Sequence, residues 1–322
     1  MSAKLHEITG PLPIITIAGP TASGKSHLAL ALAERYDGEI VNADSMQVYR
    51  ELPILTARPG ADDEARIRHH IYGVMGVADA CSAGVWLKLA VAAIIAIRAR
   101  GRLPIVCGGT GLYLKVLREG IAPVPDVPSD VAEQAGAEYD REGAEAFHAR
   151  VAALDAAAAN RLPPTDRQRL IRAYAVVTAT GRTLDQWQAE QPSGAAVDGP
   201  FFSVVLAPPR EVLYARIEAR FATMVAAGAL AEVAALGRRN LAPDLPAMKA
   251  LGVPEFRRHL AGECSLDEAV TKAQQLTRNF AKRQSTWFRH QLAADLTVAD
   301  FGDAAFDRVA DTVGAYLEGQ SW

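Results

Sequence analysis

The sequence of 322 residues is poor in cysteine and in long apolar runs. Its three cysteines, Cys81, Cys107 and Cys264, lie far apart and form no C-x-x-C pair, which excludes a disulfide framework and a thiolate zinc site. The longest apolar run, residues 89–97, is much shorter than the roughly 18 residues of a membrane-spanning helix, and no export signal is recognisable at the N-terminus. We therefore expect a protein of the reducing cytoplasm with no membrane partner.

The sequence also has little excess charge, and its seven histidines show no metal-ligand spacing. The formal net charge is −3, but it is unevenly spread. Residues 1–159 carry 15 basic and 19 acidic side chains (−4), residues 160–290 carry 18 and 12 (+6), and residues 291–322 carry 1 and 6 (−5). A net charge near zero therefore does not exclude a nucleic-acid partner for the basic part of the chain.

Apolar runs that alternate with helical patterns predict an α/β fold with a parallel, doubly wound sheet. The predicted strands are residues 13–18, 39–43, 70–75, 103–107, 201–206 and 295–298. The first predicted core helix follows residue 26 and ends at Tyr36, and the second runs from Ser82 to about Gly101. Three more are predicted at residues 111–118, 211–236 and 265–290.

This alternation stops at three closely spaced prolines, Pro123, Pro125 and Pro128. Residues 129–188 show helical patterns without a strand. We therefore predict an α/β core formed by residues 1–124 and 200–322, interrupted by a helical insertion at residues 125–199.

Residues 19–26, Gly-Pro-Thr-Ala-Ser-Gly-Lys-Ser, match the phosphate-loop pattern G-x-x-x-x-G-K-[ST] between a predicted strand and a helix. Backbone N–H groups of such a loop converge on phosphate oxygens, and Lys25 adds a positive charge. We predict Mg²⁺ as cofactor, with Ser26 as its ligand. The predicted phosphate-binding residues are Gly19, Pro20, Thr21, Ala22, Ser23, Gly24, Lys25 and Ser26. The alternative is a glycine-rich turn without a ligand.

The acid that P-loop ATPases place at a strand end is missing after Val106, where Gly108, Gly109 and Thr110 follow. The strand that does lead to an acid is 39–43, which Asp44 follows. An acid beside the phosphate loop can act as a general base or as a partner of metal-bound water. The alternative is that Asp44 only caps a turn.

Six segments, in order between residues 13 and 290, resemble the bacterial tRNA dimethylallyltransferases, also called tRNA isopentenyltransferases. They are residues 19–26, 44–49 (DSMQVY), 56–59 (TARP), 108–113 (GGTGLY), 166–173 (DRQRLIRA) and 281–287 (AKRQ, then TW after one residue). The resemblance implies a P-loop NTPase-like core, a parallel sheet flanked by helices, with a helical insertion domain. It implies transfer of a dimethylallyl group from dimethylallyl diphosphate to the exocyclic amine of the adenosine 3′ of the anticodon, with release of pyrophosphate and no need for ATP hydrolysis.

The resemblance also implies roles for individual residues. Asp44 matches the general base, Thr110 matches a threonine near the diphosphate and the base, and Arg220 resembles an arginine that clamps the pyrophosphate. Arg216, one helical turn earlier, ranks second, and either arginine could instead be a solvated helix residue. The residues expected to contact the anticodon stem-loop of tRNA are Asp44, Ser45, Met46, Gln47, Gln168, Arg169, Leu170, Ile171, Arg172, Lys249, Arg278, Lys282 and Arg283.

The basic helix at 278–290 carries Phe280 and Trp287, and charge with aromatic rings suits RNA. The alternative is that both rings face the core. The sequence departs from the family pattern at Leu55, where a glycine is usual, at residues 253–254, and around Val131, where an arginine is frequent.

Two other functions use the same loop. An adenylate isopentenyltransferase acts on a free nucleotide but generally lacks the long insertion and the basic C-terminal helices. A small-molecule kinase would transfer phosphate from ATP and would need an acidic strand end. We expect a monomer whose partners are tRNA and dimethylallyl diphosphate.

Overall fold

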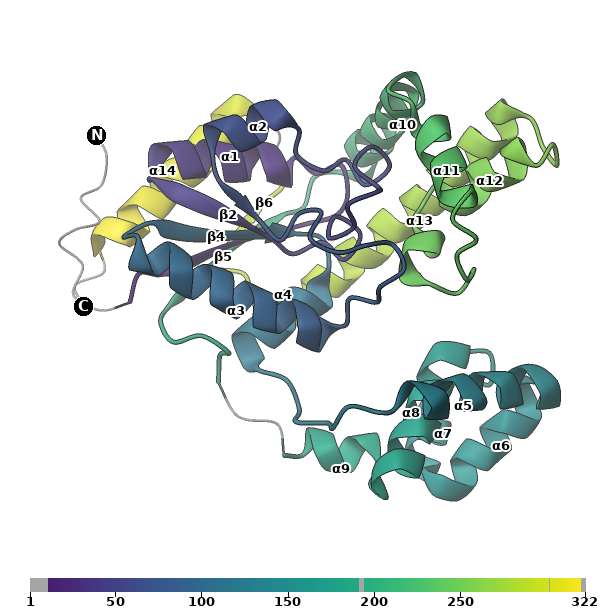
Figure 1. Cartoon of the computed structure of the whole chain (residues 1–322). Coiled ribbons are helices and arrows are strands. Elements are labelled where there is room, and N and C mark those ends of the chain that lie inside the picture. Colours follow the sequence, from purple (N-terminus) through teal and green to yellow (C-terminus); the bar gives the residue numbers. More distant parts are fainter. Residues whose placement is uncertain (1–10, 191–193, 301, 320–322) are drawn as a thin grey trace. The chain divides into compact units, whose positions relative to one another are not determined.

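The computed structural model describes residues 11–190, 194–300 and 302–319, and the chain divides into two compact units (Figure 1). The first unit contains residues 1–118 and 195–322, and the second contains residues 119–194. The boundaries of the second unit lie slightly upstream of the predicted insertion, 125–199. The first ten and last three residues of the predicted core lie outside the described residues.

The first unit is built on a six-stranded parallel sheet in the order β3-β2-β4-β1-β5-β6, which confirms the predicted fold class. Its strands are β1 (Ile14–Ala18), β2 (Gly38–Asn42), β3 (His69–His70), β4 (Leu103–Gly108), β5 (Phe201–Leu206) and β6 (Leu296–Val298). The prediction of a strand over 70–75 was wrong in length. Ile71 has a left-handed backbone conformation (φ 66°) that ends β3, and Met75 forms only an isolated bridge with Tyr49.

The first unit has helices on both faces of this sheet and further helices beyond one end of it (Figure 1). They are α1 (Lys25–Arg35), α2 (Ala61–Arg66), α3 (Ala83–Ala99), α4 (Gly111–Glu119), α10 (Arg210–Ala226), α11 (Ala229–Gly237), α12 (Val253–Leu260), α13 (Leu266–Gln291) and α14 (Asp303–Gly319), with a short 3₁₀ turn η2 (Pro246–Lys249). Alternate strand residues face opposite sides, so Ile15 and Ile17 pack with α1 and α14, whereas Ile14 and Ala18 pack in the core that contains α3 and α4. Both faces are therefore buried, as in other parallel sheets.

The helix predicted over 211–236 is two helices. Gly228 adopts the left-handed conformation (φ 101°), which ends α10 and begins α11. In the described part of the chain no single helix is both long and apolar enough to cross a membrane, and α10 with α11 meets that test only as a pair bent by 66°.

Among its described residues the second unit contains helices and no strand, and it has its own core. Its helices are α5 (Ser129–Glu142), α6 (Ala144–Leu154), α7 (Ala156–Arg161), α8 (Arg167–Thr180) and α9 (Leu184–Gln188). Its buried residues are Ala135, Phe147, Val151, Ala158, Ala159, Leu170 and Ala173.

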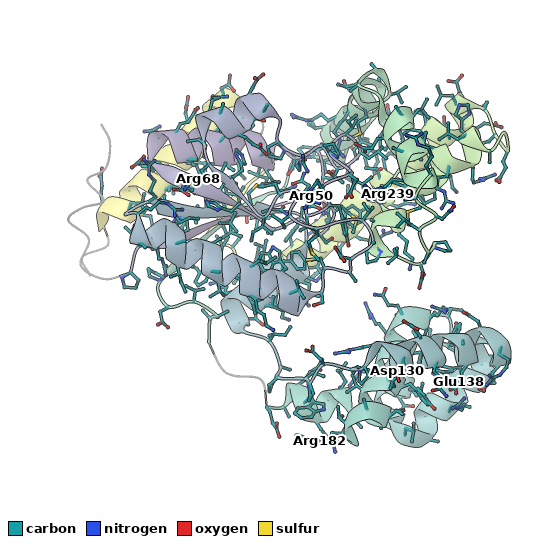
Figure 2. The ribbon with its side chains drawn as sticks, viewed as in Figure 1. Arg50, Arg68, Asp130, Glu138, Arg182 and Arg239 are labelled. Carbon is teal, nitrogen blue, oxygen red and sulfur yellow. The ribbon has the colours of Figure 1, made fainter. Side chains whose placement is uncertain are left out.

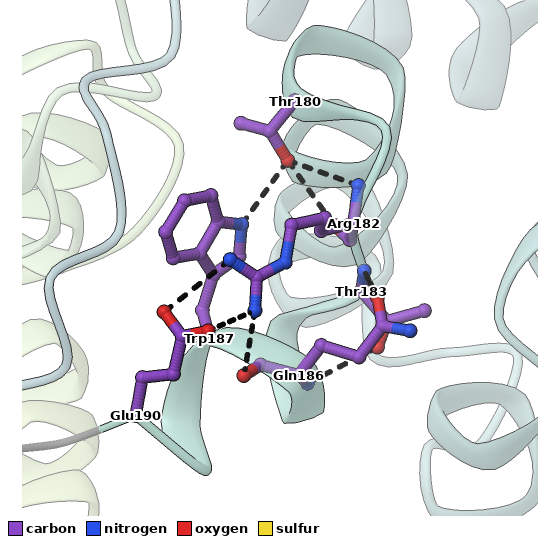
Figure 3. Close-up of polar contacts among 6 residues, drawn as sticks. All are labelled: Thr180, Arg182, Thr183, Gln186, Trp187 and Glu190. Atoms are coloured by element: carbon purple, nitrogen blue, oxygen red, sulfur yellow. Dashed lines mark hydrogen bonds and ion pairs between the residues drawn. The ribbon is translucent and has the colours of Figure 1, made fainter.

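A polar cluster fixes the turn between α8 and α9 (Figure 3). The Arg182 guanidinium lies 4.1 Å from the centroid of the Trp187 ring and forms an ion pair with Glu190 at 2.6 Å. Trp187 Nε1 donates to Thr180 Oγ1 at 3.1 Å. The Thr183 side chain caps α9 in a capping box with Gln186. Stacking, charge and helix capping together thus hold the turn between α8 and α9.

Candidate functional site

The phosphate loop joins β1 to α1 at the carboxyl edge of the sheet. Gly24, in the left-handed conformation (φ 90°), leads the chain into α1. Lys25 Nζ donates to the Pro20 carbonyl oxygen at 2.7 Å, so the side chain folds back over the loop. Burial lowers the pKa of Lys25 to about 8, although Asp44 opposes this effect. The loop therefore holds a cation whose charge is costly without an anion beside it.

Gln284 of α13 connects the phosphate loop to the end of β4. Its Oε1 accepts from Thr21 N at 2.8 Å, and its Nε2 donates to the Gly109 carbonyl at 2.7 Å. The side chain is 6% exposed. Sequence reasoning placed Gln284 in a family segment but not in the site, because one glutamine on a helix carries no chemical signature of its own.

Arg220 of α10 reaches the same loop, which sets aside the alternative of a solvated helix residue. Its Nη2 donates to Thr21 Oγ1 at 2.7 Å. Burial lowers the pKa of Arg220, while the charge of Asp44 raises it and that of Arg216 lowers it. The loop thus has two partly buried cations, Lys25 and Arg220, and an anion that binds here would neutralise both.

Asp44 follows β2 and is held by its neighbour Asn42, which is fully buried. Asp44 N donates to Asn42 Oδ1 at 2.8 Å, and Asn42 Nδ2 donates to the carbonyl oxygens of Asp44 and Ile71, both at 3.0 Å. Asp44 Oδ1 accepts from Met46 N at 2.9 Å. The carboxylate therefore stabilises a turn with one oxygen and retains a second oxygen, so the two predicted roles are compatible. Asn42 was missed, although a polar residue at the end of the apolar strand was its signal.

Thr110 joins the end of β4 to the segment after β2. Its backbone N donates to the Ala43 carbonyl at 3.1 Å, and its Oγ1 accepts from Ser45 N at 2.9 Å and donates to Ser45 Oγ at 3.2 Å. The structure therefore brings Thr110 and the Asp44 segment together.

A cavity of about 390 Å³ adjoins the phosphate loop at Pro20. It lies between α10 and α13 and is lined by Arg210, Lys282 and Arg289 together with apolar side chains such as Leu206. Three cations around one opening give it a positive potential, which attracts anionic ligands. Lys282, expected to contact tRNA, thus lines a cavity that reaches Pro20 of the phosphate loop.

The side chains around the phosphate loop suit a magnesium ion only if the substrate supplies most of the ligands of the ion. Within the described ranges no group of three or more His, Cys, Asp or Glu side chains could hold a metal. Ser26 is exposed at the second position of α1. Mg²⁺ keeps several waters and binds substrate phosphates with one or two protein groups, so one hydroxyl beside a diphosphate fits this mode.

The residues predicted to contact tRNA differ in exposure. Gln168, Arg169 and Arg172 are exposed on α8, and Lys249, Lys282 and Arg283 are exposed in the first unit. Leu170 is fully buried in the core of the second unit, because it faces α5 and α6 from the apolar side of α8, so its side chain is not available to RNA. Ile171 is partly buried against the same core.

Two basic and two aromatic residues of α13 are engaged within the protein. Arg278 pairs with Glu218 at 3.0 Å, and its side chain is only 20% exposed. Trp287 packs against the large core, which agrees with the core-facing alternative, whereas Phe280 lies under the Arg283 guanidinium at 5.7 Å. In the C-terminal half of this helix the exposed lysine and arginine side chains are Lys282, Arg283 and Arg289.

Comparisons with known proteins give one consistent result. The model of the IPP transferase family matches residues 47–291. The chain is 54% identical over 283 residues to a tRNA dimethylallyltransferase of Nitrobacter hamburgensis (88% of this chain, 89% of the relative) and 52% identical over 291 residues to one of Rhodospirillum rubrum (90% and 89%).

Solved structures agree. A tRNA isopentenylpyrophosphate transferase from Bacillus halodurans is 31% identical with a TM-score of 0.67, covering 95% of this chain and 97% of that one. A eukaryotic dimethylallyltransferase acting on tRNA is 25% identical with a TM-score of 0.80, covering 96% and 80%.

Proposed function

This chain belongs to the IPP transferase family, and from that membership we propose that it transfers a dimethylallyl group from dimethylallyl diphosphate to the exocyclic amine of an adenosine in tRNA. The target is the adenosine 3′ of the anticodon, and pyrophosphate is the second product. One observation supports this most strongly: Lys25, Arg220 and Asp44 surround one phosphate loop, and β4 ends in glycines where an ATPase would carry an acid.

In the proposed reaction a bond forms between the amine nitrogen of adenosine and C1 of the dimethylallyl group, while the bond from C1 to the diphosphate oxygen breaks. Charge develops on the leaving diphosphate, where Lys25, Arg220 and the loop N–H groups bind it more strongly than in the ground state. The free carboxylate oxygen of Asp44 takes the proton that leaves the amine.

Ser26 would hold a magnesium ion together with the bound diphosphate, and the ion would supply positive charge near the leaving group. Thr110 and Ser45 hold the segment that carries Asp44. The target base is stacked in the anticodon loop, so it must leave the stack to reach the carboxylate.

The test incubates the chain with labelled dimethylallyl diphosphate in two parallel reactions, one with undermodified tRNA and one with free AMP as the acceptor. We expect label in tRNA and release of pyrophosphate. Label in AMP alone would replace the tRNA assignment with an adenylate isopentenyltransferase, and phosphate transfer from ATP would indicate a kinase.

A further inference from the structure

Glu232, in the first turn of α11, lies outside every segment that carries the family resemblance, yet it makes two long-range contacts. Its Oε2 accepts from Ile54 N at 2.8 Å and its Oε1 accepts from Leu55 N at 3.0 Å. Burial raises the pKa of Glu232, and these two hydrogen bonds oppose that shift. A carboxylate that binds two successive N–H groups with both oxygens fixes the backbone it holds.

The held backbone forms a tight turn over residues 53–58. Ala57 N donates to the Ile54 carbonyl and Arg58 N donates to the Pro53 carbonyl, both at 3.0 Å. Ala57 has a left-handed backbone conformation (φ 50°), which a residue with a side chain keeps only when its surroundings impose it. Glu232 supplies that constraint at the start of the turn.

The turn in its place holds Gln47. Gln47 Nε2 donates to the carbonyl oxygens of Thr56 at 2.9 Å and Ala57 at 3.2 Å. Both amide hydrogens are therefore used, and Oε1 is the atom that can still accept a hydrogen bond. A carbonyl oxygen held in this way suits an N–H donor on the edge of an unstacked base.

Further contacts join the turn region to α11 and its neighbour. Arg239 lies just beyond the end of α11 (Figure 2), and its Nη1 pairs with Glu51 Oε1 at 2.6 Å. Leu55 packs over Gly252, where an added Cβ would lie 2.8 Å from Leu55 Cδ2. Leu55, one departure from the family pattern, therefore packs on the glycine that directly precedes the other departure, residues 253–254. The Glu51–Arg239 pair is exposed and contributes little, so the partly buried Glu232 is the stronger tie between α11 and the turn.

We propose that Glu232 is a positioning residue for recognition of the RNA. It fixes the turn at 53–58, the turn fixes Gln47, and Gln47 Oε1 accepts a hydrogen bond from the nucleotide next to the target adenosine. This inference rests on the proposed function, which places Gln47 against the RNA. The donor side has separate supports, since Arg220 and Gln284 both hold Thr21.

The test compares Glu232→Gln with the unsubstituted chain in steady-state transfer. The new amide group presents N–H where an acceptor is needed, so one backbone N–H loses its partner. We expect the KM for an anticodon stem-loop RNA to rise about tenfold, and discrimination against a stem-loop with a changed neighbouring base to fall. The KM for dimethylallyl diphosphate should stay within about twofold. The control is Glu211→Gln, an exposed acid in the first turn of α10, which should match the unsubstituted chain.

A double-mutant cycle tests whether Glu232 acts through Gln47. If it does, Glu232→Gln combined with Gln47→Ala is no worse than the more impaired single variant. Additive losses would overturn the proposal. So would an unchanged KM for RNA in Glu232→Gln when the unsubstituted chain transfers label normally. Absence of label transfer by the unsubstituted chain would instead overturn the proposed function, and this inference with it.

Amide exchange on the unsubstituted chain gives a measurement that does not depend on a variant folding. Peptides that cover Ile54 and Leu55 should exchange slowly, and more slowly than the exposed amides at the start of α2. Exchange at the rate of an unstructured peptide would show that Glu232 does not hold the turn.

Discussion

At the scale of single residues, Lys25 makes binding of the diphosphate depend on pH. Its pKa of about 8 in the free protein rises when the anion binds, because the diphosphate stabilises the charged form. Affinity for dimethylallyl diphosphate is therefore constant below pH 8 and falls above it, by up to about tenfold per pH unit. Binding above pH 8 should take up about one proton, which calorimetry in buffers of different ionisation enthalpy measures.

Dimethylallyl diphosphate itself does not take up or release a proton in this pH range. Its terminal phosphate is already ionised, as in a phosphate monoester, whose second pKa is about 6. Lys25→Arg is the control, since its guanidinium remains charged throughout this range. An equally steep loss of affinity in Lys25→Arg would assign the titration to another group.

Asp44→Asn separates the proposed base from its structural role. Asparagine Oδ1 can still accept from Met46 N, so the turn should persist, but the side chain can no longer take a proton. We expect the transfer rate to fall by about 10²- to 10⁴-fold, with binding of dimethylallyl diphosphate within a few-fold of the original. Asp62→Asn, on the exposed first turn of α2, is the matched control. Transfer at the original rate in Asp44→Asn would remove the proposed base.

The sequence predicted those site residues whose chemistry is local. The phosphate loop and Asp44 stand beside predicted strand ends, so their place followed from short patterns. Gln284 and Glu232 could not be found in this way, because their partners are distant in the sequence. Gln284 lies 263 residues from its partner Thr21, and Glu232 lies 178 residues from its partner Ile54. Their importance exists only after the fold brings those backbone groups to them.

At the scale of helices and strands, α13 stabilises the site through Gln284. Gln284→Ala leaves Thr21 N and the Gly109 carbonyl without their partner in a buried place. We expect the free energy of unfolding, measured by urea denaturation, to fall by about 2–4 kcal/mol. The KM for dimethylallyl diphosphate should rise as well, because the loop loses an anchor.

Gln275→Ala on the same helix is the control, since its side-chain hydrogen bonds are exposed. Its unfolding free energy should change by less than about 0.5 kcal/mol. Equal stability of the Gln284 and Gln275 variants would contradict the bridging role.

Helices and strands were predictable where periodicity and capping agreed. Ser82 caps α3 by accepting from Val85 N, and α13 begins at a Ser265 capping box. The failures occurred where a single backbone conformation decided the outcome, at Ile71 after β3 and at Gly228 between α10 and α11. A hydrophobic pattern does not encode those φ angles, and strand order also depends on contacts distant in sequence.

At the scale of the whole molecule, charge is distributed according to the proposed partners. The acidic segment 291–322 includes the whole of α14, which packs on the sheet through its apolar face. Exposed basic residues lie on α8 of the second unit and on α13 of the first. The overall charge of −3 therefore conceals the positive surface that an RNA backbone requires.

Binding of tRNA should consequently depend steeply on salt, because each phosphate contact releases counterions. With several such contacts, we expect the logarithm of the association constant to fall linearly with the logarithm of salt concentration. Between 50 and 200 mM salt the association constant should fall at least about tenfold. Arg172 and Arg283 are exposed, and Arg172→Gln and Arg283→Gln should each reduce the slope of this salt dependence by about one if the arginine contacts a phosphate. Arg278→Gln should leave the slope unchanged, because this arginine is already paired with Glu218. A tRNA affinity independent of salt would show that these basic faces do not bind the RNA backbone, and a slope altered equally by Arg278→Gln would show that the ion pair opens on binding.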